Sequence, residues 1–147
     1  MSLVTSPSGQ TNFASTGVPV VVLPAATTAY TVTLAQSGSI IQLNAIAAPC
    51  TITLPPTAAA AGFNCKIVVG TVLGAAGATT ITSTAGTFTA TLINNVTTTN
   101  GVLQNNIGFQ NASARGANFD IVCDGVTYMC FGRSTGAANV LCPYAAP

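Results

Sequence analysis

Asp120 and Asp124 are the only two carboxylates among the side chains, and both lie in FDIVCDGVTYMCFGR, residues 119–133, together with Arg133. Two nearby carboxylates can act as a general acid and a general base. However, the chain has no histidine, and this stretch has no lysine or glutamate beside either aspartate. Arg133 is positioned to reach Asp120 across a hairpin. Because Asp-Gly is a strong hairpin signal, we expect Asp124 to serve the turn rather than catalysis.

The length of the loop around Asp124-Gly125 decides which residues of the two hairpin strands share a face. A loop of two or four residues places Phe119, Ile121 and Cys123 on one face with Val126, Tyr128 and Cys130. A loop of three residues matches the first set with Thr127, Met129 and Phe131 instead. The even loop gives the more coherent apolar face and is preferred. Neither even loop sets Cys123 opposite Cys130, so a local disulfide is not expected.

The five cysteines favour neither a disulfide framework nor a reactive site. Their number is odd, no CxxC pair or histidine is present, and no export signal is visible at the start of the sequence. Cys50, Cys65, Cys123 and Cys130 fall on the apolar parity of their expected strands, where a thiol behaves as a small hydrophobic group. Cys142 is left as the candidate for pairing between chains. We expect no catalytic residue, metal or cofactor.

Charge is unusually scarce, at 3% of residues with a formal net charge of +1. Typical globular domains contain about 25% charged residues. A mean hydropathy of +0.60 argues against disorder, and the apolar runs are too broken for a membrane helix. The small net charge does not indicate a basic surface that would bind nucleic acid or an acidic membrane. Proteins with a net charge near zero tend to associate.

The elements that position these residues are expected to be short strands. Alternating or continuous apolar runs separated by turn signals predict about ten of them. The ranges are 18–23, 29–35, 40–45, 50–54, 65–70, 80–83, 87–93, 102–110 and the two arms of the hairpin. Residues 57–63 have room for one helical turn with Thr57 as its cap. The expected fold is all-β, a compact antiparallel sandwich or barrel of jelly-roll-like form.

The chain divides into an extended N-terminal arm, residues 1–17, and a β-domain, residues 18–147. The arm is small, polar and without pattern. It either folds back on its own domain or lies on a neighbouring subunit, and the sequence favours neither. Candidate assembly contacts are the apolar or rigid residues near the two ends: Phe13, Pro19, Pro143 and Tyr144.

Threonines occupy the outward positions of several expected strands: Thr31 and Thr33, Thr51 and Thr53, and Thr87, Thr89 and Thr91. β-Propensity on a hydrated face accounts for them. An ordered threonine array that binds ice requires a strict sequence repeat, and none is found.

A longer pattern covers about residues 29–136, from YTVTLAQSGSIIQLNAIAAPCTITLPPTAAAAGFNCKIVVGT to GANFDIVCDGVTYMCFGRSTG. It resembles small virion proteins of tailed phages and related large DNA viruses. The matching positions are Leu34, Ser37, Gly38, Leu43, Asn44, Ala45, Thr51, Thr53, Leu54, Pro55, Ala61, Gly62, Ile67, Val68, Asp124, Gly125, Tyr128, Gly132 and Ser134. The tryptophan usual before the hairpin tyrosine is absent. The resemblance implies a capsid decoration (cement) or fibre protein, often trimeric, and brings no catalytic residues.

The expected function is therefore that of a non-enzymatic virion protein on the capsid surface, assembled in the host cytoplasm. Its partners would be the major capsid protein and further copies of itself, most simply in a trimer, and no small-molecule substrate is expected. An alternative is a fibre or receptor-binding module for host glycans, although such sites use exposed aromatics and carboxylates, and the chain has few of either. A cellular adhesin or surface-layer unit is a third possibility, disfavoured by the lack of a visible signal peptide.

Overall fold

The structure is a computed structural model that describes residues 4–5, 11–12, 17–93, 98–134 and 141–144. Its regular elements are strands and two single-turn 3-10 helices, η1 (Leu34–Gln36) and η2 (Thr57–Ala59). The strands are β1 (Val4–Thr5), β2 (Thr11–Asn12), β3 (Val20–Leu23), β4 (Ala29–Thr31), β5 (Ser39–Asn44), β6 (Cys50–Leu54), β7 (Asn64–Thr71), β8 (Thr79–Ser83), β9 (Thr87–Ile93), β10 (Thr98–Gln104), β11 (Asn106–Phe109), β12 (Asn118–Cys123), β13 (Thr127–Arg133) and β14 (Leu141–Tyr144).

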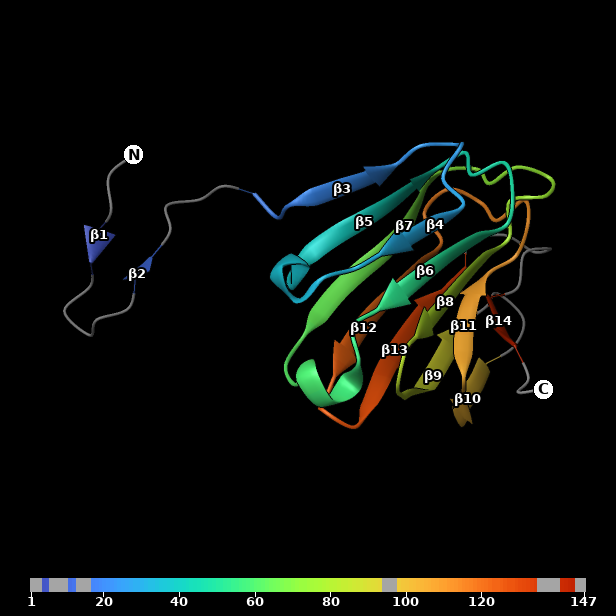
Figure 1. Ribbon diagram of the computed structural model, residues 1–147. Coiled ribbons are helices and arrows are strands. Elements are labelled where there is room, and N and C mark those ends of the chain that lie inside the picture. Colours follow the sequence, from blue (N-terminus) through green and yellow to red (C-terminus); the bar gives the residue numbers. More distant parts are fainter. Residues whose placement is uncertain (1–3, 6–10, 13–16, 94–97, 135–140, 145–147) are drawn as a thin grey trace.

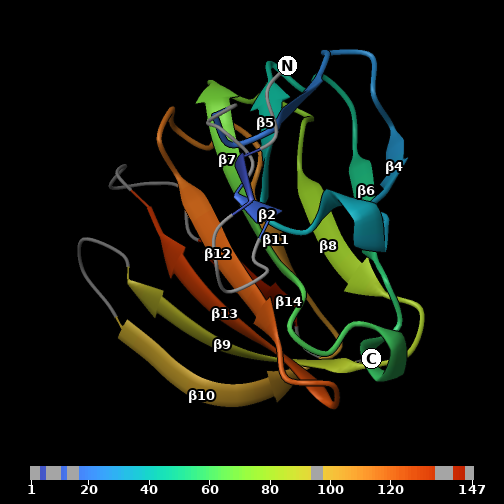
Figure 2. The ribbon, with the colours of Figure 1, turned by 90° about the vertical axis from the view of Figure 1, so that its left-hand side faces the viewer.

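Two large sheets face each other across one core (Figures 1 and 2). The seven-stranded sheet has the order β10-β9-β13-β12-β7-β5-β3, and the five-stranded sheet has the order β14-β11-β8-β6-β4. β1 and β2 pair with each other in a separate small ribbon. The all-β expectation is thus confirmed at the level of a β-rich fold.

From β3 to β8 the chain alternates between the two sheets. β3, β5 and β7 are parallel neighbours in one sheet, and β4, β6 and β8 are parallel neighbours in the other. The chain therefore makes three successive coils, each giving one strand to each sheet. The connections between sheets also stack, because the Ala47 N–H donates to the Ala25 carbonyl at 3.1 Å and the Gly74 N–H donates to the Ile46 carbonyl at 2.8 Å.

The expectation of antiparallel sheets is wrong, since both large sheets are mixed. A chain that crosses to the opposite sheet after every strand returns in the same direction, so its next strand pairs in parallel. β9 and β13 also pair in parallel. In the two large sheets every antiparallel pair includes a strand from β9 onward, and this pattern differs from an antiparallel jelly roll.

The predicted strand faces are largely confirmed. Alternate residues of β6 and β7 are buried, namely Cys50, Ile52 and Leu54, and Cys65, Ile67 and Val69. β9, β11 and the strands of the hairpin contribute aromatic rings. Phe88 stacks on Tyr128 with ring centroids 5.4 Å apart, and Phe109 meets Phe119 edge-on at 4.9 Å.

Three local predictions are wrong. The strand expected over residues 29–35 ends at Thr31, because the Gln36 side chain accepts a hydrogen bond from the Thr33 N–H at 2.9 Å and closes η1. Leu34 is consequently exposed rather than inward. Thr57 does not cap η2; Pro56 holds the cap position, and the buried Thr57 hydroxyl donates to the Ala85 carbonyl.

The third concerns residues 102–110, which form parts of two strands in different sheets. β10 ends at Gln104 in the seven-stranded sheet, and β11 begins at Asn106 in the five-stranded sheet. The apolar pattern runs across this junction and so conceals the change of sheet.

Candidate binding face on the seven-stranded sheet

The β12–β13 hairpin adopts the preferred even register. Ile121 pairs with Cys130, and Cys123 pairs with Tyr128, so Cys123 and Cys130 are not opposite each other. The expected core strip is buried, consisting of Phe119, Ile121, Cys123, Tyr128 and Cys130. Val126 is the exception: it lies in the turn and is 75% exposed. The outward residues of the hairpin therefore share one face of the sheet.

Asp124 serves the turn, as its sequence position predicted. Its Oδ1 accepts hydrogen bonds from the backbone N–H groups of Thr127 at 2.6 Å and Val126 at 2.7 Å. These bonds, with that of Thr127 contributing most, lower the pKa of the Asp124 carboxyl. Gly125 follows with φ of +98°, a conformation that a side chain disfavours. Asp124 thus holds the loop closed.

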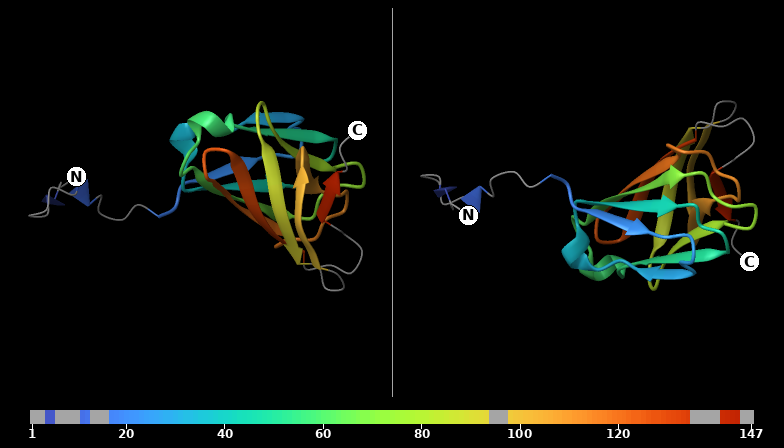
Figure 3. Two further views of the ribbon diagram at one scale, coloured as in Figure 1. Left: turned by 90° about the horizontal axis from the view of Figure 1, so that it is seen from below. Right: turned by 90° about the horizontal axis from the view of Figure 1, so that it is seen from above.

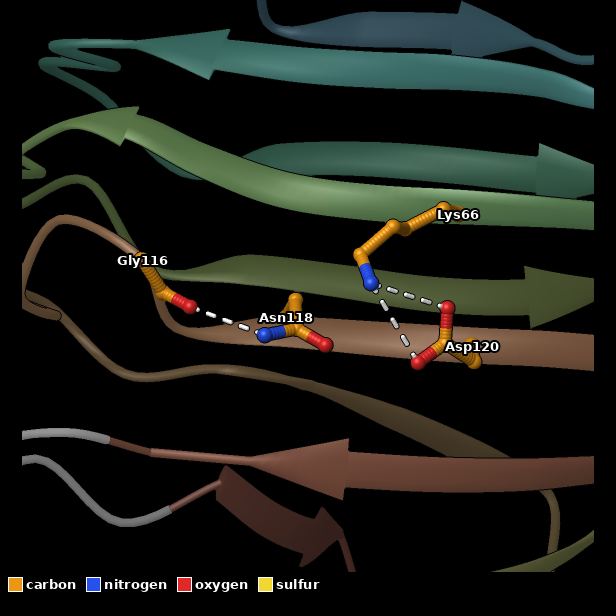
Figure 4. A network of polar contacts seen from close by, with 4 residues as sticks. All are labelled: Lys66, Gly116, Asn118 and Asp120. Carbon is orange, nitrogen blue, oxygen red and sulfur yellow. Dashed lines mark hydrogen bonds and ion pairs between the residues drawn. The ribbon is translucent and has the colours of Figure 1, made fainter.

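Asp120 forms an ion pair with Lys66 from the neighbouring strand β7. The Lys66 Nζ lies 3.1 Å from the Asp120 Oδ1 and 3.4 Å from its Oδ2 (Figure 4). The two side chains are 40% and 54% exposed, so this pair contributes on the order of 0.2–1 kcal/mol. Arg133 stands diagonally from Asp120, opposite Asn118, and forms no ion pair with Asp120 in the described part of the chain.

These residues belong to two adjacent rows on the outer face of the sheet. One row runs through the paired residues Ile40, Lys66, Asp120, Phe131 and Thr91 of five neighbouring strands. The next row contains Val68, Asn118 and Arg133. Three of the five charged side chains of the chain, those of Lys66, Asp120 and Arg133, are thereby gathered on one face.

Two hollows adjoin the Lys66–Asp120 ion pair. One has a volume of about 260 Å³ and is lined by Lys66, Asn118, Asp120, Phe131, Gly132 and Arg133. The other measures about 400 Å³, shares Lys66 and Asp120, and extends past Val122, Ile40 and Val18 toward the edge of the sheet. The ion pair therefore lies where a polar hollow meets a mainly apolar one.

The buried cysteines are unsuited to nucleophilic chemistry. Burial raises the pKa of the Cys50 thiol and, with a smaller effect of the Asp120 charge, raises the pKa of Cys65 to about 12. Burial also raises the pKa of Cys130. Because the thiolate is the reactive form, these groups stay protonated and inert near neutral pH. Within the described residues, no three potential metal ligands of the His, Cys, Asp and Glu types lie together.

The five-stranded sheet presents threonines on its outer face, and they are in register. Thr31 pairs with Thr53 and Thr53 with Thr82, while Thr51 pairs with Thr80 in the next row. The sequence showed no repeat because the loops between these strands differ in length. This face carries no charged residue among its described strand positions.

The candidate assembly residues that the structure describes lie at the edges of two different sheets. Pro19 directly precedes β3, which confirms the edge position predicted for this segment, and its carbonyl accepts the Ile40 N–H at 2.8 Å. Pro143 and Tyr144 lie on β14, at the edge of the five-stranded sheet remote from β4. Phe13 lies outside the described residues.

Sequence reasoning missed Lys66, Asn118 and Phe131 as members of this face. Lys66 and Asp120 are 54 positions apart, and only the pairing of β7 with β12 brings them together. The alternation of residues in its strand does predict that Lys66 points outward. It does not reveal which strand lies next to it.

No protein-family model, curated protein or solved structure matches this chain. Within the described residues, no helix is both long and apolar enough to cross a membrane.

Proposed function

We propose that this chain is a non-enzymatic virion surface protein, a capsid decoration (cement) protein that binds the major capsid protein and stabilises its lattice. The resemblance of residues 29–136 to small virion proteins motivates the proposal. The structural observation that supports it is a charge-free sheet edge that no described strand covers.

That edge is β3, the last strand of the seven-stranded sheet. β3 pairs with β5 on one side, and no described strand pairs with it on the other. Val18, Val20 and Val22 are 58%, 53% and 51% exposed along this segment. Natural proteins usually protect such edges with charged residues, and this segment has none. An edge of this kind is stable against aggregation when another protein covers it.

β4 ends the other large sheet at the same end of the molecule (Figure 3, right). The edges of β3 and β4 together form what we call the open end of the molecule. One partner can contact both edges. Adhesion proceeds by burial: a stable interface covers about 1,200–2,000 Å² in total. A surface poor in charge lowers the desolvation cost of such a contact.

In this proposal the protein acts as a sandwich of two mixed sheets and assembles as a homotrimer at a threefold or quasi-threefold position of the capsid lattice.

The β3 edge is tested by a charge placed on it. We expect Val20→Lys to weaken binding to particles that lack the protein by about tenfold or more, or about 1.4 kcal/mol, because the contact must then bury a charge. Val126→Lys is the matched control, since Val126 is also exposed but lies in the β12–β13 turn. Co-sedimentation with purified particles measures binding, and circular dichroism verifies folding. Equal binding of the two folded variants would exclude β3 as the contact.

A further inference from the structure

The smaller hollow on the seven-stranded sheet is lined by both polar side chains and one aromatic ring. Its polar atoms come from Lys66, Asn118, Asp120 and Arg133, and its apolar surface comes from Phe131. Phe131 is 55% exposed, and none of the ring contacts in the described part of the chain involves it. Small-molecule sites combine aromatic surface with a few convergent polar groups, and this hollow has both.

Arg133 has a guanidinium group without an ion-pair partner among the described residues. The carboxylate of Asp120 is already held by Lys66, whose ammonium contacts both of its oxygens. The three charges of the hollow leave a net charge of +1, and it is the planar fork of Arg133 that remains available. That fork binds carboxylates through two parallel hydrogen bonds.

Acceptors stand opposite the ring and the guanidinium. The Asn118 amide nitrogen donates to the Gly116 carbonyl at 2.8 Å, which fixes the side chain and leaves its oxygen turned away from Gly116 (Figure 4). Asn118 pairs with Arg133, and Asp120 pairs with Phe131. Opposed strand residues have Cβ atoms about 4.5–5.5 Å apart, and Phe131 and Arg133 lie two residues apart on one face, about 6.8 Å.

We propose that this hollow binds an acidic saccharide, a sugar unit that carries a carboxylate. The apolar face of the sugar ring lies on Phe131, the carboxylate pairs with Arg133, and ring hydroxyls donate to Asn118 and Asp120. This site goes beyond particle binding, since it lies on the face of the sheet rather than on its β3 edge.

Nucleic acid fits the hollow less well. A phosphodiester chain requires several cations along its path, and this hollow holds only one cation outside the Lys66–Asp120 ion pair, that of Arg133. A shallow, exposed site of this size also implies modest affinity, with a Kd on the order of 1 mM. Binding should weaken with added salt because the Arg133 contact is exposed.

The test uses the full chain with 3′-sialyllactose and trigalacturonate as probes, and lactose as the neutral counterpart. Saturation-transfer NMR measures contact and titration of the labelled protein gives Kd. We expect both acidic probes to bind and lactose to bind about tenfold more weakly, or about 1.4 kcal/mol. Arg133→Gln should reduce binding of the acidic probes to the level of lactose, and Arg133→Lys should restore it in part.

Phe131→Ser should weaken all three sugars, while Val126→Ser, at another exposed apolar position, should change none. Thermal unfolding confirms that each variant is folded. The proposal is overturned if the acidic probes fail to bind, if lactose binds equally well, or if Arg133→Gln binds like the unsubstituted chain. Tighter binding of an aspartate-containing peptide than of either acidic sugar would assign the hollow to a protein partner instead.

Discussion

Tyr128 connects the hairpin to the opposite sheet. It is fully buried, stacks on Phe88 and meets Phe63 edge-on, and its hydroxyl donates to the Pro55 carbonyl at 2.7 Å. Pro55 follows β6 of the five-stranded sheet, whereas Tyr128 lies on β13 of the seven-stranded sheet. Because the buried hydroxyl has one strong hydrogen-bond partner, a single substitution can measure what this bond contributes to the free energy of unfolding.

We predict that Tyr128→Phe lowers the free energy of unfolding by about 1 kcal/mol, because the ring contacts remain while the hydrogen bond is lost. Ser83 also donates to the Pro55 carbonyl, at 3.0 Å, so this oxygen keeps a partner. Tyr30→Phe is the control, since Tyr30 is only partly buried and its hydroxyl accepts from Gln36. Urea unfolding measures both. Equal losses for the two variants would contradict the assigned role.

Because of the buried thiols, the free energy of unfolding should depend on pH in the alkaline range. The folded-state pKa of Cys65 is about 12, and that of Cys130 is also raised, whereas an unfolded thiol ionises near 8.5. The unfolded chain therefore loses protons first. The contribution of the protonated thiols to the stability of the folded chain is complete below about pH 8.5. It declines as the pH rises toward the folded-state pKa values.

We predict that the free energy of unfolding falls between pH 8.5 and pH 10 by up to about 1.4 kcal/mol per pH unit for each such thiol. Urea midpoints at pH 7, 8.5 and 10 measure the slope. Cys130→Ala should give a shallower slope, although it is less stable at every pH. A midpoint that stays constant from pH 7 to pH 10 would show that the thiols are not buried in this way.

At the scale of elements, the coils depend on close contact between successive crossovers. Gly77, between β7 and β8, lies against the crossover that follows β5. A Cβ atom at Gly77 would stand 1.8 Å from the Ile46 carbonyl oxygen, which is far too close. The Gly77 N–H also donates to the Gly74 carbonyl, which in turn lies over the same crossover. A side chain at this position must push the coils apart.

We predict that Gly77→Ala destabilises the fold by about 1–3 kcal/mol through this overpacking. Gly17→Ala is the matched control, because a Cβ there meets nothing within 4 Å. Thermal unfolding of the two variants measures the difference. If Gly77→Ala is as stable as Gly17→Ala, the crossovers are not stacked as described.

Much of the element structure could be predicted from the sequence, whereas the pairing of elements could not. The alternation of Cys50, Ile52 and Leu54 defines both a strand and its inward face. Nothing in that pattern indicates whether β6 turns back beside β7 or crosses to the other sheet, since both solutions bury the same side chains. The Lys66–Asp120 pair and the aligned rows of Thr53 and Thr82 depend on that choice.

The turn chemistry was predictable because it is local. Asp124-Gly125 encodes its own hydrogen bonds and backbone conformation, and the structure shows both. Arg133 shows the opposite case. Its neighbours depend on the register of a whole hairpin, and a shift of two residues exchanges Asp120 for Asn118 as its partner.

At the scale of the whole molecule, the few charges are distributed unevenly. The seven-stranded sheet carries Lys66, Asp120 and Arg133 on its outer face, whereas the five-stranded sheet presents aligned threonines. The open end formed by β3 and β4 has no charge. This asymmetry gives the molecule one uncharged end, which we propose binds a protein lattice, and one face that carries charge.

We propose above all that the chain stabilises a capsid by covering its β3 edge against the lattice. The most direct measurement compares the resistance to heat and osmotic shock of complete particles, particles lacking the protein, and depleted particles to which the unsubstituted chain or Val20→Lys has been added back. We expect depleted particles to rupture first, and only the unsubstituted chain to restore full resistance. Depleted particles as resistant as complete ones would contradict the claim.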